Sequence, residues 1–292
     1  MISDQLSSHL ISILKKHAGQ EVKINSISPV SGGDINEAFR LKTNAGDYFL
    51  KINDDVRFPG MFEKEARGLE LLSKHTGLTV PGVIENGTAG NHAFLLMEFI
   101  SSSGMQQNFW NDFAHGLADL HKSTADAFGL DHDNYIGSLP QYNDQHDNWI
   151  SFFIEERLGK QLKLAVDHRV MGRQDIRSFE KLYGKLPEIF PEEPPVLLHG
   201  DLWSGNYMTG SRGEAVLIDP AVYYGHREMD LGMSKLFGGF SATFYIAYQE
   251  AYPLEKGWEK RLDICNLYPL LVHVNLFGGG YVSSVRNIIS RF

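Results

Sequence analysis

The chain has 292 residues, of which 42% are hydrophobic, and a formal net charge of −9. This length and apolar content suffice for one large domain or for two lobes with separate cores. The acidic balance argues against a nucleic-acid-binding protein, because phosphate backbones require clustered Lys and Arg. The single cysteine, Cys265, excludes an internal disulfide or a cysteine zinc cluster. It lies in an apolar-rich stretch and is expected to be buried and inert.

The N-terminal sequence has no basic segment followed by an apolar run, so no signal peptide is expected. No uninterrupted apolar stretch approaches the roughly 20 residues that a membrane-spanning helix needs. A reducing cytoplasm is the simplest setting for a chain with one cysteine. We therefore expect a cytoplasmic protein that binds neither membrane nor nucleic acid, and the sequence makes no prediction about its oligomeric state.

The first third of the chain has the pattern of a small β-rich lobe after an N-terminal helix. Strand-like runs occur at residues 22–30, 37–43, 48–53, 82–87 and 92–100. The first three runs are separated by good turn sequences. Residues 60–75 are expected to form the main helix of this lobe, because apolar side chains recur there at helical spacing.

The remainder of the chain has the pattern of a larger, mainly helical lobe. Helices are expected at residues 109–120, 149–164 and 175–190 and from about 227 to the C-terminus. A β-rich interlude covers 196–219. The two lobes join near residues 99–104, where a serine-rich linker is expected. The predicted fold is α+β and bilobal, with a small antiparallel sheet, domains at 1–100 and 101–292, and a ligand cleft at the join.

The segment from Val196 to Asn206 carries the most informative motif. An apolar run leads into a polar loop that contains Asp201 and, five residues later, Asn206. Kinase catalytic loops use this Asp-x-x-x-x-Asn spacing. Phosphoryl transfer requires a base that accepts the proton of the substrate hydroxyl, and Asp201 suits that role. Asn206 can supply a carbonyl oxygen to Mg²⁺.

A second acidic residue follows the next apolar run, Ala215–Ile218. Asp219 stands directly after this expected strand and is predicted to bind Mg²⁺ and bridge it to the β- and γ-phosphates of ATP. Pro220 stands where protein kinases carry Phe, and no Gly follows, so the mobile switch built on the Asp-Phe-Gly motif is not expected. The ordered set of Asp201, Asn206 and Asp219 predicts an ATP- and Mg²⁺-dependent kinase for small molecules.

A phosphate-anchoring pair is predicted in the first lobe. Lys51 lies between apolar residues on an expected strand, and the helix at 60–75 offers a carboxylate partner. Glu65 is the preferred partner because it precedes Ala66 at the start of the apolar face, with Glu63 as the alternative. Such a pair holds the lysine ammonium against the α- and β-phosphates. An exposed lysine on an edge strand is the competing interpretation.

Two further segments are predicted to contact ATP. Gly32 and Gly33 lie between two strands, where glycines let the backbone approach phosphates; an ordinary hairpin turn explains them equally well. Met97, Glu98, Phe99 and Ile100 end the strand at the expected join, where backbone groups can pair with adenine and Met97 can line the back wall. No Walker-type Gly-x-x-x-x-Gly-Lys-Ser/Thr sequence is present.

Other polar residues near these motifs are expected to be structural. His199 is expected to brace the loop of Asp201 by hydrogen bonds, and His121 to lie behind it. Asp230 is expected to cap the helix that begins beside it or to pair with its dipole. His273 lies in an apolar helix; it is either a core histidine with a satisfied ring or a residue that faces the acceptor pocket.

Taken together, these motifs resemble the signatures of the aminoglycoside phosphotransferase and choline kinase superfamily, whose members share a protein-kinase-like fold. The chain is similar, over nearly its whole length, to the fructosamine kinase (ketosamine-3-kinase) family. Four further segments carry this narrower resemblance: residues 134–141, Trp149 with Phe152 and Arg157-Leu158, residues 223–231 and residues 236–240. Some members of the family have a redox-active cysteine in the glycine-rich loop. Residues 31–34 contain none, so disulfide switching through that loop is excluded here.

The resemblance implies transfer of the γ-phosphate of ATP to the 3-hydroxyl of a ketosamine, either free or protein-bound. Decomposition of the phosphorylated adduct then frees the amine, which would make the enzyme a deglycation or repair kinase. The resemblance also implies that Trp203 lies near the sugar, where an aromatic face is physically sensible; a packing role is the alternative. Two other functions stay open at this point: a kinase for an aminoglycoside or amino alcohol, and a pseudokinase that binds nucleotide without catalysis.

Overall fold

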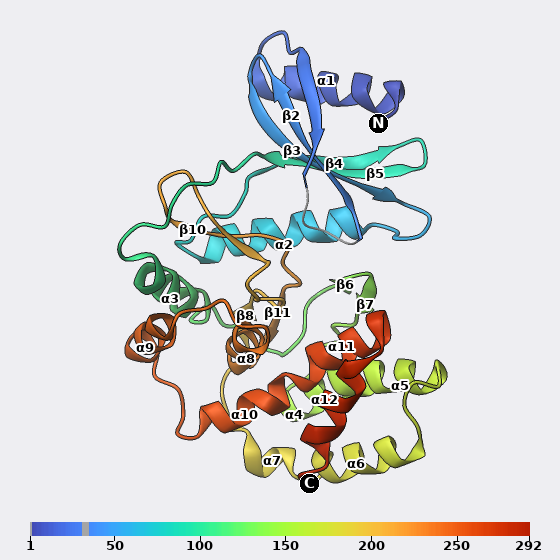
Figure 1. Ribbon diagram of the computed structural model, residues 1–292, viewed down its shortest axis with the longest axis vertical. Coiled ribbons are helices and arrows are strands. Elements are labelled where there is room, and N and C mark those ends of the chain that lie inside the picture. The colour runs from blue at the N-terminus through green and yellow to red at the C-terminus, as the bar shows by residue number, and fades with distance from the viewer. Residues whose placement is uncertain (1, 31–34) are drawn as a thin grey trace. The chain divides into compact units, whose positions relative to one another are not determined.

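The structure is a computed structural model that describes residues 2–30 and 35–292 (Figure 1). The chain forms two compact units that interleave along the sequence. The first consists of Met1–Lys74, Leu78–Phe109 and Tyr207–Asp219, and the second of His75–Gly77, Trp110–Asn206 and Pro220–Phe292. Within the described residues, no helix has both the length and the apolar character needed to cross a membrane.

The first unit is built on a five-stranded antiparallel sheet (Figure 1). Neighbouring strands follow the order β1 (Ile24–Pro29), β2 (Glu37–Thr43), β3 (Gly46–Asp54), β5 (His92–Glu98) and β4 (Val83–Ala89). β2 and β3 form a tight hairpin in which Thr43 pairs with Gly46. The strands expected from the sequence are therefore present, and they are joined into one sheet rather than into separate hairpins.

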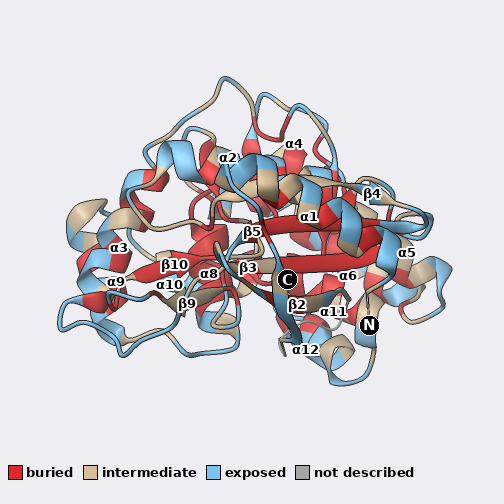
Figure 2. Ribbon diagram, turned by 90° about the horizontal axis from the view of Figure 1, so that it is seen from above, coloured by how far each residue is buried: buried red, intermediate tan, exposed pale blue. Residues whose placement is uncertain are grey.

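Helices α1 (Asp4–Ala18) and α2 (Met61–His75) pack on opposite faces of this sheet. Successive strand residues point to opposite faces. Phe94 and Leu96 of β5 accordingly join the core under α1, whereas Leu95 and Met97 join the core under α2. Figure 2 shows these central strands as buried and the outer side of α1 as exposed. Leu50 on β3 belongs to the α1 core, so the neighbouring residue on that strand faces α2.

A hairpin from later in the chain completes the first unit. β9 (Tyr207–Thr209) pairs with β10 (Ala215–Leu217), and the Leu217 N–H donates a hydrogen bond of 2.9 Å to the carbonyl of Thr79. This bond attaches β10 to the segment between α2 and β4. Ile218 and Asp219, which directly follow β10, therefore belong to the unit that contains the five-stranded sheet.

The second unit is mainly helical and also contains two antiparallel pairs of short strands. Its strands are β6 (Asn134–Ile136) with β7 (Leu139–Gln141), and β8 (Val196–Leu198) with β11 (Tyr223–Gly225). Its helices are α3 (Phe109–Leu120), α4 (Trp149–Phe152), η1 (Phe153–Gly159), α5 (Lys160–Asp167), α6 (Arg173–Tyr183), α7 (Leu186–Ile189), α8 (Glu228–Leu236), α9 (Ala242–Ala251), α10 (Trp258–Cys265), α11 (Leu267–Phe277) and α12 (Gly280–Ile289).

Two helices in this unit differ from the periodicity-based expectation. The segment 149–164 is one continuous helical path, but its middle part, η1, is a π-helix. The segment 175–190 is broken into α6 and α7, because Pro187 lies in the first turn of α7 and starts a new helix. Cys265 is fully buried at the end of α10, as expected, and burial raises the pKa of its thiol well above the ordinary value.

Candidate active site

The site residues predicted from the sequence fall into two groups, one in each compact unit. Lys51, Glu65, Asp219 and the end of β5 belong to the first unit, and the loop of Asp201 belongs to the second. Gly32 and Gly33 lie outside the described residues.

Lys51 is the centre of the group in the first unit. It is 6% exposed and lies on the α2 side of β3. Its Nζ donates to Glu65 Oε1 at 2.7 Å and to Asp219 Oδ1 at 2.5 Å. The partner on α2 is Glu65, the residue preferred from the sequence, while Glu63 is exposed. A buried strand lysine, a helix carboxylate and the acid after β10, whose side chain is 40% exposed, thus meet in one charged cluster.

The charges of this cluster stabilise one another. Burial alone would lower the pKa of Lys51, but the carboxylates of Asp219 and Glu65 raise it above its ordinary value. Burial raises the pKa of Glu65, and the nearby ammonium of Lys51 opposes that rise. Lys51 is therefore a fixed positive charge at neutral pH, which is the form that can attract a phosphate group.

Asp219 has a left-handed backbone conformation, with φ of 54°. Such a conformation costs energy for a non-glycine residue and is common at functional positions. It lies two residues after β10, so the strand ends and the chain turns at the carboxylate. The backbone strain is retained at the position where the sequence predicts a metal ligand.

The end of β5 shows which backbone groups the sheet already uses. Met97 is buried, and Glu98 is exposed. The Glu98 N–H donates to the carbonyl of Gly82 at 2.9 Å, while the Gly82 N–H donates to Glu98 Oε2 at 3.2 Å. Arg40 lies over the ring of Phe99 at 4.2 Å. The Glu98 N–H is thus engaged with Gly82, and the pairing of adenine with backbone groups of residues 97–100 stays a prediction.

The loop after β8 forms a tight turn in the second unit. Asn206 Nδ2 donates to the carbonyl of Asp201 at 2.9 Å and to its Oδ2 at 2.8 Å. The Trp203 N–H also donates to the Asp201 carbonyl, at 3.1 Å, and the Asn206 N–H donates to the Trp203 carbonyl at 3.0 Å. These bonds bring the predicted base and the predicted amide ligand together and fix the orientation of both.

A buried carboxylate supports this loop from behind. Asp230 of α8 is 1% exposed and accepts the N–H groups of His199 at 2.8 Å and Gly200 at 2.9 Å. Its Oδ2 also lies 3.2 Å from Nε2 of His121, whose Nδ1 is 2.7 Å from the hydroxyl of Tyr248. Burial raises the pKa of Asp230, but these hydrogen bonds and the nearby histidines hold it below its ordinary value. The expected cap of α8 is therefore instead an anchor for the loop of Asp201.

Gly200 is required by the backbone geometry of the same loop. Its φ is 83°, and a Cβ at this position would lie 2.0 Å from the carbonyl oxygen of Ala221. The Ala221 N–H donates to the carbonyl of His199 at 2.9 Å. The loop thus passes directly against residue 221, and only glycine permits this approach.

A network of buried amides that the sequence did not reveal holds the segment after Asp219. Asn134 Nδ2 donates to the Val222 carbonyl at 2.8 Å, and Gln141 Nε2 donates to the Ala221 carbonyl at 3.0 Å. Tyr268 in turn donates its hydroxyl to Gln141 Oε1 at 2.8 Å. The only sequence signal for this network was a pair of amides bracketing a hairpin.

Trp203 begins a group of aromatic side chains. Its ring is 36% exposed and lies edge-on to Phe237, with centroids 5.9 Å apart. Phe237 contacts His273 at 5.0 Å, and His273 contacts Tyr281 at 4.9 Å. His273 Nδ1 donates to the carbonyl of Pro269 at 2.7 Å, and burial lowers its pKa. His273 is therefore a neutral ring with its own backbone partner, set within an aromatic surface that reaches the Asp201 loop.

Comparison with known proteins places this arrangement in a family. The model of the family described as "Fructosamine kinase" matches residues 6–292. The chain is 42% identical over 275 residues to "Probable ketoamine kinase HMPREF0351_12196" of Enterococcus faecium, covering 93% of this chain and 97% of that protein. It is 41% identical over 284 residues to "Protein-ribulosamine 3-kinase, chloroplastic" of Arabidopsis thaliana, covering 94% and 84%.

Solved structures show the same fold. A Haemophilus somnus 129PT protein assigned as a fructosamine-3-kinase superposes with a TM-score of 0.86 and 32% identity, over 97% of this chain and 96% of that one. A thermostable mutant of aminoglycoside phosphotransferase APH(4)-Ia matches with a TM-score of 0.59 and 17% identity, over 96% and 98%, which shows the fold alone. The predicted protein-kinase-like α+β fold is confirmed. The chain belongs to the fructosamine kinase family and is an ATP-dependent phosphotransferase that acts on a hydroxyl group.

Proposed function

We propose that this enzyme transfers the γ-phosphate of ATP to the 3-hydroxyl of ketosamines of the ribulosamine or fructosamine type. The observation that carries the proposal is the braced loop, which presents Asp201 beside Asn206 and continues into the exposed ring of Trp203. A carboxylate base next to an aromatic surface suits a sugar hydroxyl, because the ring can cover the apolar face of the sugar. Relatives named ketoamine kinase and ribulosamine 3-kinase support the same acceptor class.

Each step of the transfer has a named residue in this proposal. Asp201 accepts the proton of the acceptor hydroxyl as its oxygen bonds to the γ-phosphorus and the bond to the β-phosphate oxygen breaks, so the products are the phosphate ester and ADP. Lys51, held by Glu65, binds the α- and β-phosphates. Phe99 or Ile100 is the proposed backbone donor for adenine, since the Glu98 N–H is bonded to Gly82.

Asn206 and Asp219 are the proposed Mg²⁺ ligands. A carboxylate and an amide supply the hard oxygen donors that Mg²⁺ prefers, so these residues fit the ion. When bound, Mg²⁺ supplies charge neutralisation of the phosphates. The APH(4)-Ia structures with ADP or AMP-PNP and hygromycin B show nucleotide bound to a protein of the same fold.

An acceptor panel tests the proposed function. Purified enzyme with ATP and Mg²⁺ is given a ribulosamine, a fructosamine, kanamycin and choline, and ADP release and product mass are measured. We expect phosphorylation of the ketosamines, with the phosphate on the 3-hydroxyl by NMR and release of the free amine on standing. Transfer to kanamycin or choline alone would overturn the ketosamine assignment, and no transfer by a nucleotide-binding protein would indicate a pseudokinase.

A further inference from the structure

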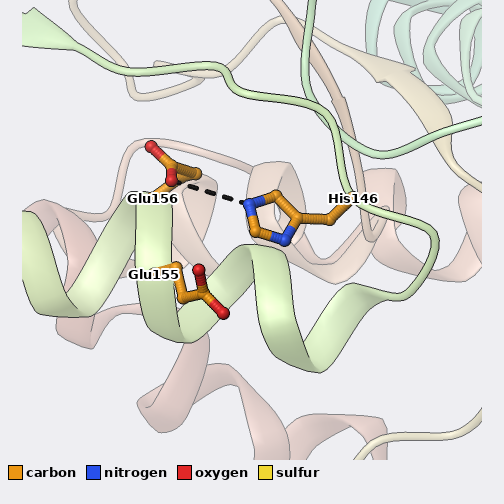
Figure 3. Close-up of side chains that lie close together, drawn as sticks. All are labelled: His146, Glu155 and Glu156. Atoms are coloured by element: carbon orange, nitrogen blue, oxygen red, sulfur yellow. Dashed lines mark ion pairs between the residues drawn. The ribbon is translucent and has the colours of Figure 1, made fainter.

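A second cluster of metal-ligating side chains lies in the second unit, apart in sequence from the residues proposed to bind ATP, Mg²⁺ and the acceptor. It consists of His146, in the loop after β7, and Glu155 and Glu156 of the π-helix η1. One ligand atom from each side chain lies within 4.8 Å of the others. Figure 3 shows the imidazole facing the helix, with one ring nitrogen directed toward Glu156 and the carboxylate of Glu155 on the same side.

The π-helix is what brings two consecutive glutamates to one imidazole. Successive side chains of an α-helix diverge by about 100°, whereas the wider π turn rotates less per residue, so neighbours lie closer to a common direction. Gly159 permits this turn, because a Cβ there would lie 2.7 Å from the carbonyl oxygen of Ile154. Short π segments are rare in proteins overall, but those that do occur often lie at functional sites.

His146 is also held in place before any ion binds. The backbone N–H of His146 donates to the carbonyl of Phe128 at 3.0 Å, and the backbone carbonyl of His146 accepts the Phe128 N–H at 2.9 Å. Its ring packs edge-on against Phe152, with centroids 5.9 Å apart. The imidazole therefore projects toward the glutamates from a fixed backbone.

Glu156 provides the independent sign that a cation belongs here. Its side chain is 5% exposed, yet its Oε2 accepts no hydrogen bond from any residue that the structure describes. Two nitrogen atoms lie near its carboxylate: His146 Nε2, 3.5 Å from Oε1, and Lys160 Nζ, 3.6 Å from Oε2. Charge-assisted hydrogen bonds are about 2.7–2.9 Å long. A buried carboxylate without such bonds is costly.

Another buried glutamate in the same unit shows the contrast. Glu228 is fully buried, but Arg261 donates to both of its carboxylate oxygens, at distances of 2.6–3.1 Å. The burial of Glu228 is thus compensated by a guanidinium, whereas Glu156 has no equivalent partner among the described residues. A bound divalent ion would supply the close charged contact that Lys160, at 3.6 Å, does not make.

We propose that His146, Glu155 and Glu156 bind a divalent transition-metal ion, with Zn²⁺ as the best fit. One imidazole and two carboxylates form a mixed nitrogen and oxygen set that suits Zn²⁺ at bonds of about 2.0–2.2 Å and leaves a fourth position for water. Mg²⁺ is a poor match for an imidazole ligand. The ligand atoms of such a site are about 3.3–3.6 Å apart, and rotation of the exposed Glu155 side chain closes the present spacing.

The ion would fasten the loop after β7 to η1. Asn143, three residues before His146, already accepts a hydrogen bond of 2.8 Å from Arg157 Nη2 and donates one of 3.0 Å to Asn134. Asn134 belongs to the amide network that holds residues 221 and 222. The proposed role of the ion is therefore structural, as a cross-link at the outer end of this network.

Zn²⁺ titration of the full-length enzyme, stripped with a chelator, tests the proposal. Asp219→Asn is introduced throughout to remove the predicted nucleotide-metal ligand, and calorimetry counts the remaining sites. We expect one bound Zn²⁺, a rise in Tm of about 5 °C at a hundredfold excess over Kd, and a visible Co²⁺ spectrum typical of a four-coordinate site. His146→Gln and Glu156→Gln should each weaken Zn²⁺ binding at least tenfold, whereas His92→Gln, at an exposed histidine of β5, should not.

The stability of the metal-free protein separates this role from an ordinary packing role. We expect Glu156→Gln to leave the Tm of the chelated protein unchanged or higher, because it removes a buried charge that has only long contacts to cationic groups, and to abolish the rise with Zn²⁺. Equal Zn²⁺ affinity in the His146→Gln variant would overturn the proposal. A Glu156→Gln variant that loses as much Tm without metal as with it would do the same.

Discussion

The two groups of active-site residues are held by different physical means. Lys51, Glu65 and Asp219 form a cluster of opposite charges around the buried lysine, whereas the loop of Asp201 is fixed by hydrogen bonds from its own backbone to Asp230. Ion pairs have little directional preference, so a lysine with three donors can exchange one partner for another. Backbone hydrogen bonds are directional and permit little movement.

This difference agrees with the tasks proposed for each group. Residues that bind nucleotide and Mg²⁺ must accept new partners and release them in every catalytic cycle. A base must stay where a hydroxyl oxygen will arrive, because small displacements lose much of the rate gained by positioning. The charge cluster is therefore expected to tolerate conservative changes better than the loop. The following substitutions test that expectation, from the largest effect to the smallest.

Asp201→Asn should have the largest effect on the reaction. The amide oxygen can still accept the hydrogen bond from Asn206 Nδ2, so the loop should keep its structure while the base is lost. We expect kcat for a ketosamine to fall about 10²–10⁴-fold, with unchanged Tm and unchanged ATP affinity. Steady-state kinetics measures kcat, and nucleotide titration measures the ATP affinity. Turnover equal to wild type would refute Asp201 as the base. Asp263→Asn, at an exposed ion pair with Arg291, is the control.

Gly200→Ala should break the loop through its backbone. The positive φ and the 2.0 Å approach to the Ala221 carbonyl leave no room for a Cβ. We expect the free energy of unfolding to fall by about 2–5 kcal/mol, from strain and overpacking together. Chemical denaturation measures this loss.

Gly77→Ala is the matched control, because its added Cβ meets nothing within 4 Å and its φ is not left-handed. A Gly200→Ala protein as stable as this control would show that the loop can shift away from residue 221.

Lys51 tests whether the charge cluster is adaptable. Lys51→Met removes the cation that binds phosphate and leaves Glu65 and Asp219 without their common partner. We expect kcat/KM for ATP to fall about 10–100-fold, the loss of one charge-assisted contact. Lys51→Arg should recover part of this loss, because the charge is kept although the geometry differs. Arginine no better than methionine would mean that the cluster is as rigid as the loop.

Asp230→Asn tests the anchor of the loop. The amide can accept only one of the two backbone N–H groups that the carboxylate accepts, and its NH₂ group would face the other donor. We expect a loss of about 1–3 kcal/mol in the free energy of unfolding and a fall in kcat that exceeds any change in KM for ATP. A variant with altered KM and normal kcat would indicate that Asp230 does not position the loop.

The contrast between the groups also explains what the sequence could predict. Lys51 and Glu65 were found because β-strand alternation and helical periodicity are local, and each rule fixes the face on which one side chain lies. Asp201 and Asn206 could be proposed as partners because their spacing lies within one loop, and the structure shows them hydrogen-bonded. Asp219 was placed by the apolar run that precedes it. These features all depend on residues that are close together in the sequence.

The partners of the supporting residues could not be predicted in the same way. Asp230 hydrogen-bonds to a loop 30 residues earlier, and Gln141 to a carbonyl 80 residues later. An acidic residue near the start of a helix has a local explanation as a cap, so nothing in the sequence pointed to hydrogen bonds between Asp230 and a distant loop. The π-helix at 153–159 was also missed, because one apolar face serves an α- and a π-helix almost equally well.

The smallest expected effect, on the pH dependence of stability, comes from His226, a buried base without an adequate partner. Its ring is fully buried, and burial lowers its pKa to about 4, which Arg227 and Arg261 reinforce and Glu193 opposes. In the unfolded chain this histidine has an ordinary pKa near 6.5. Between about pH 4 and pH 6.5 the unfolded chain therefore binds a proton at this residue that the folded chain does not bind. Stability should be complete above about pH 6.5 and should be lost progressively as the pH falls toward 4.

We expect the wild-type free energy of unfolding to drop by about 1 kcal/mol more than that of His226→Asn between pH 7 and pH 5.5. The asparagine oxygen can replace Nδ1, which accepts the Glu228 N–H at 3.3 Å, so the substitution removes the titration and keeps this contact. Urea unfolding at both pH values measures the difference, with His92→Asn as the exposed control. Parallel pH profiles for wild type and His226→Asn would show that the surrounding charges, rather than the burial of this ring, set the acid sensitivity of the second unit.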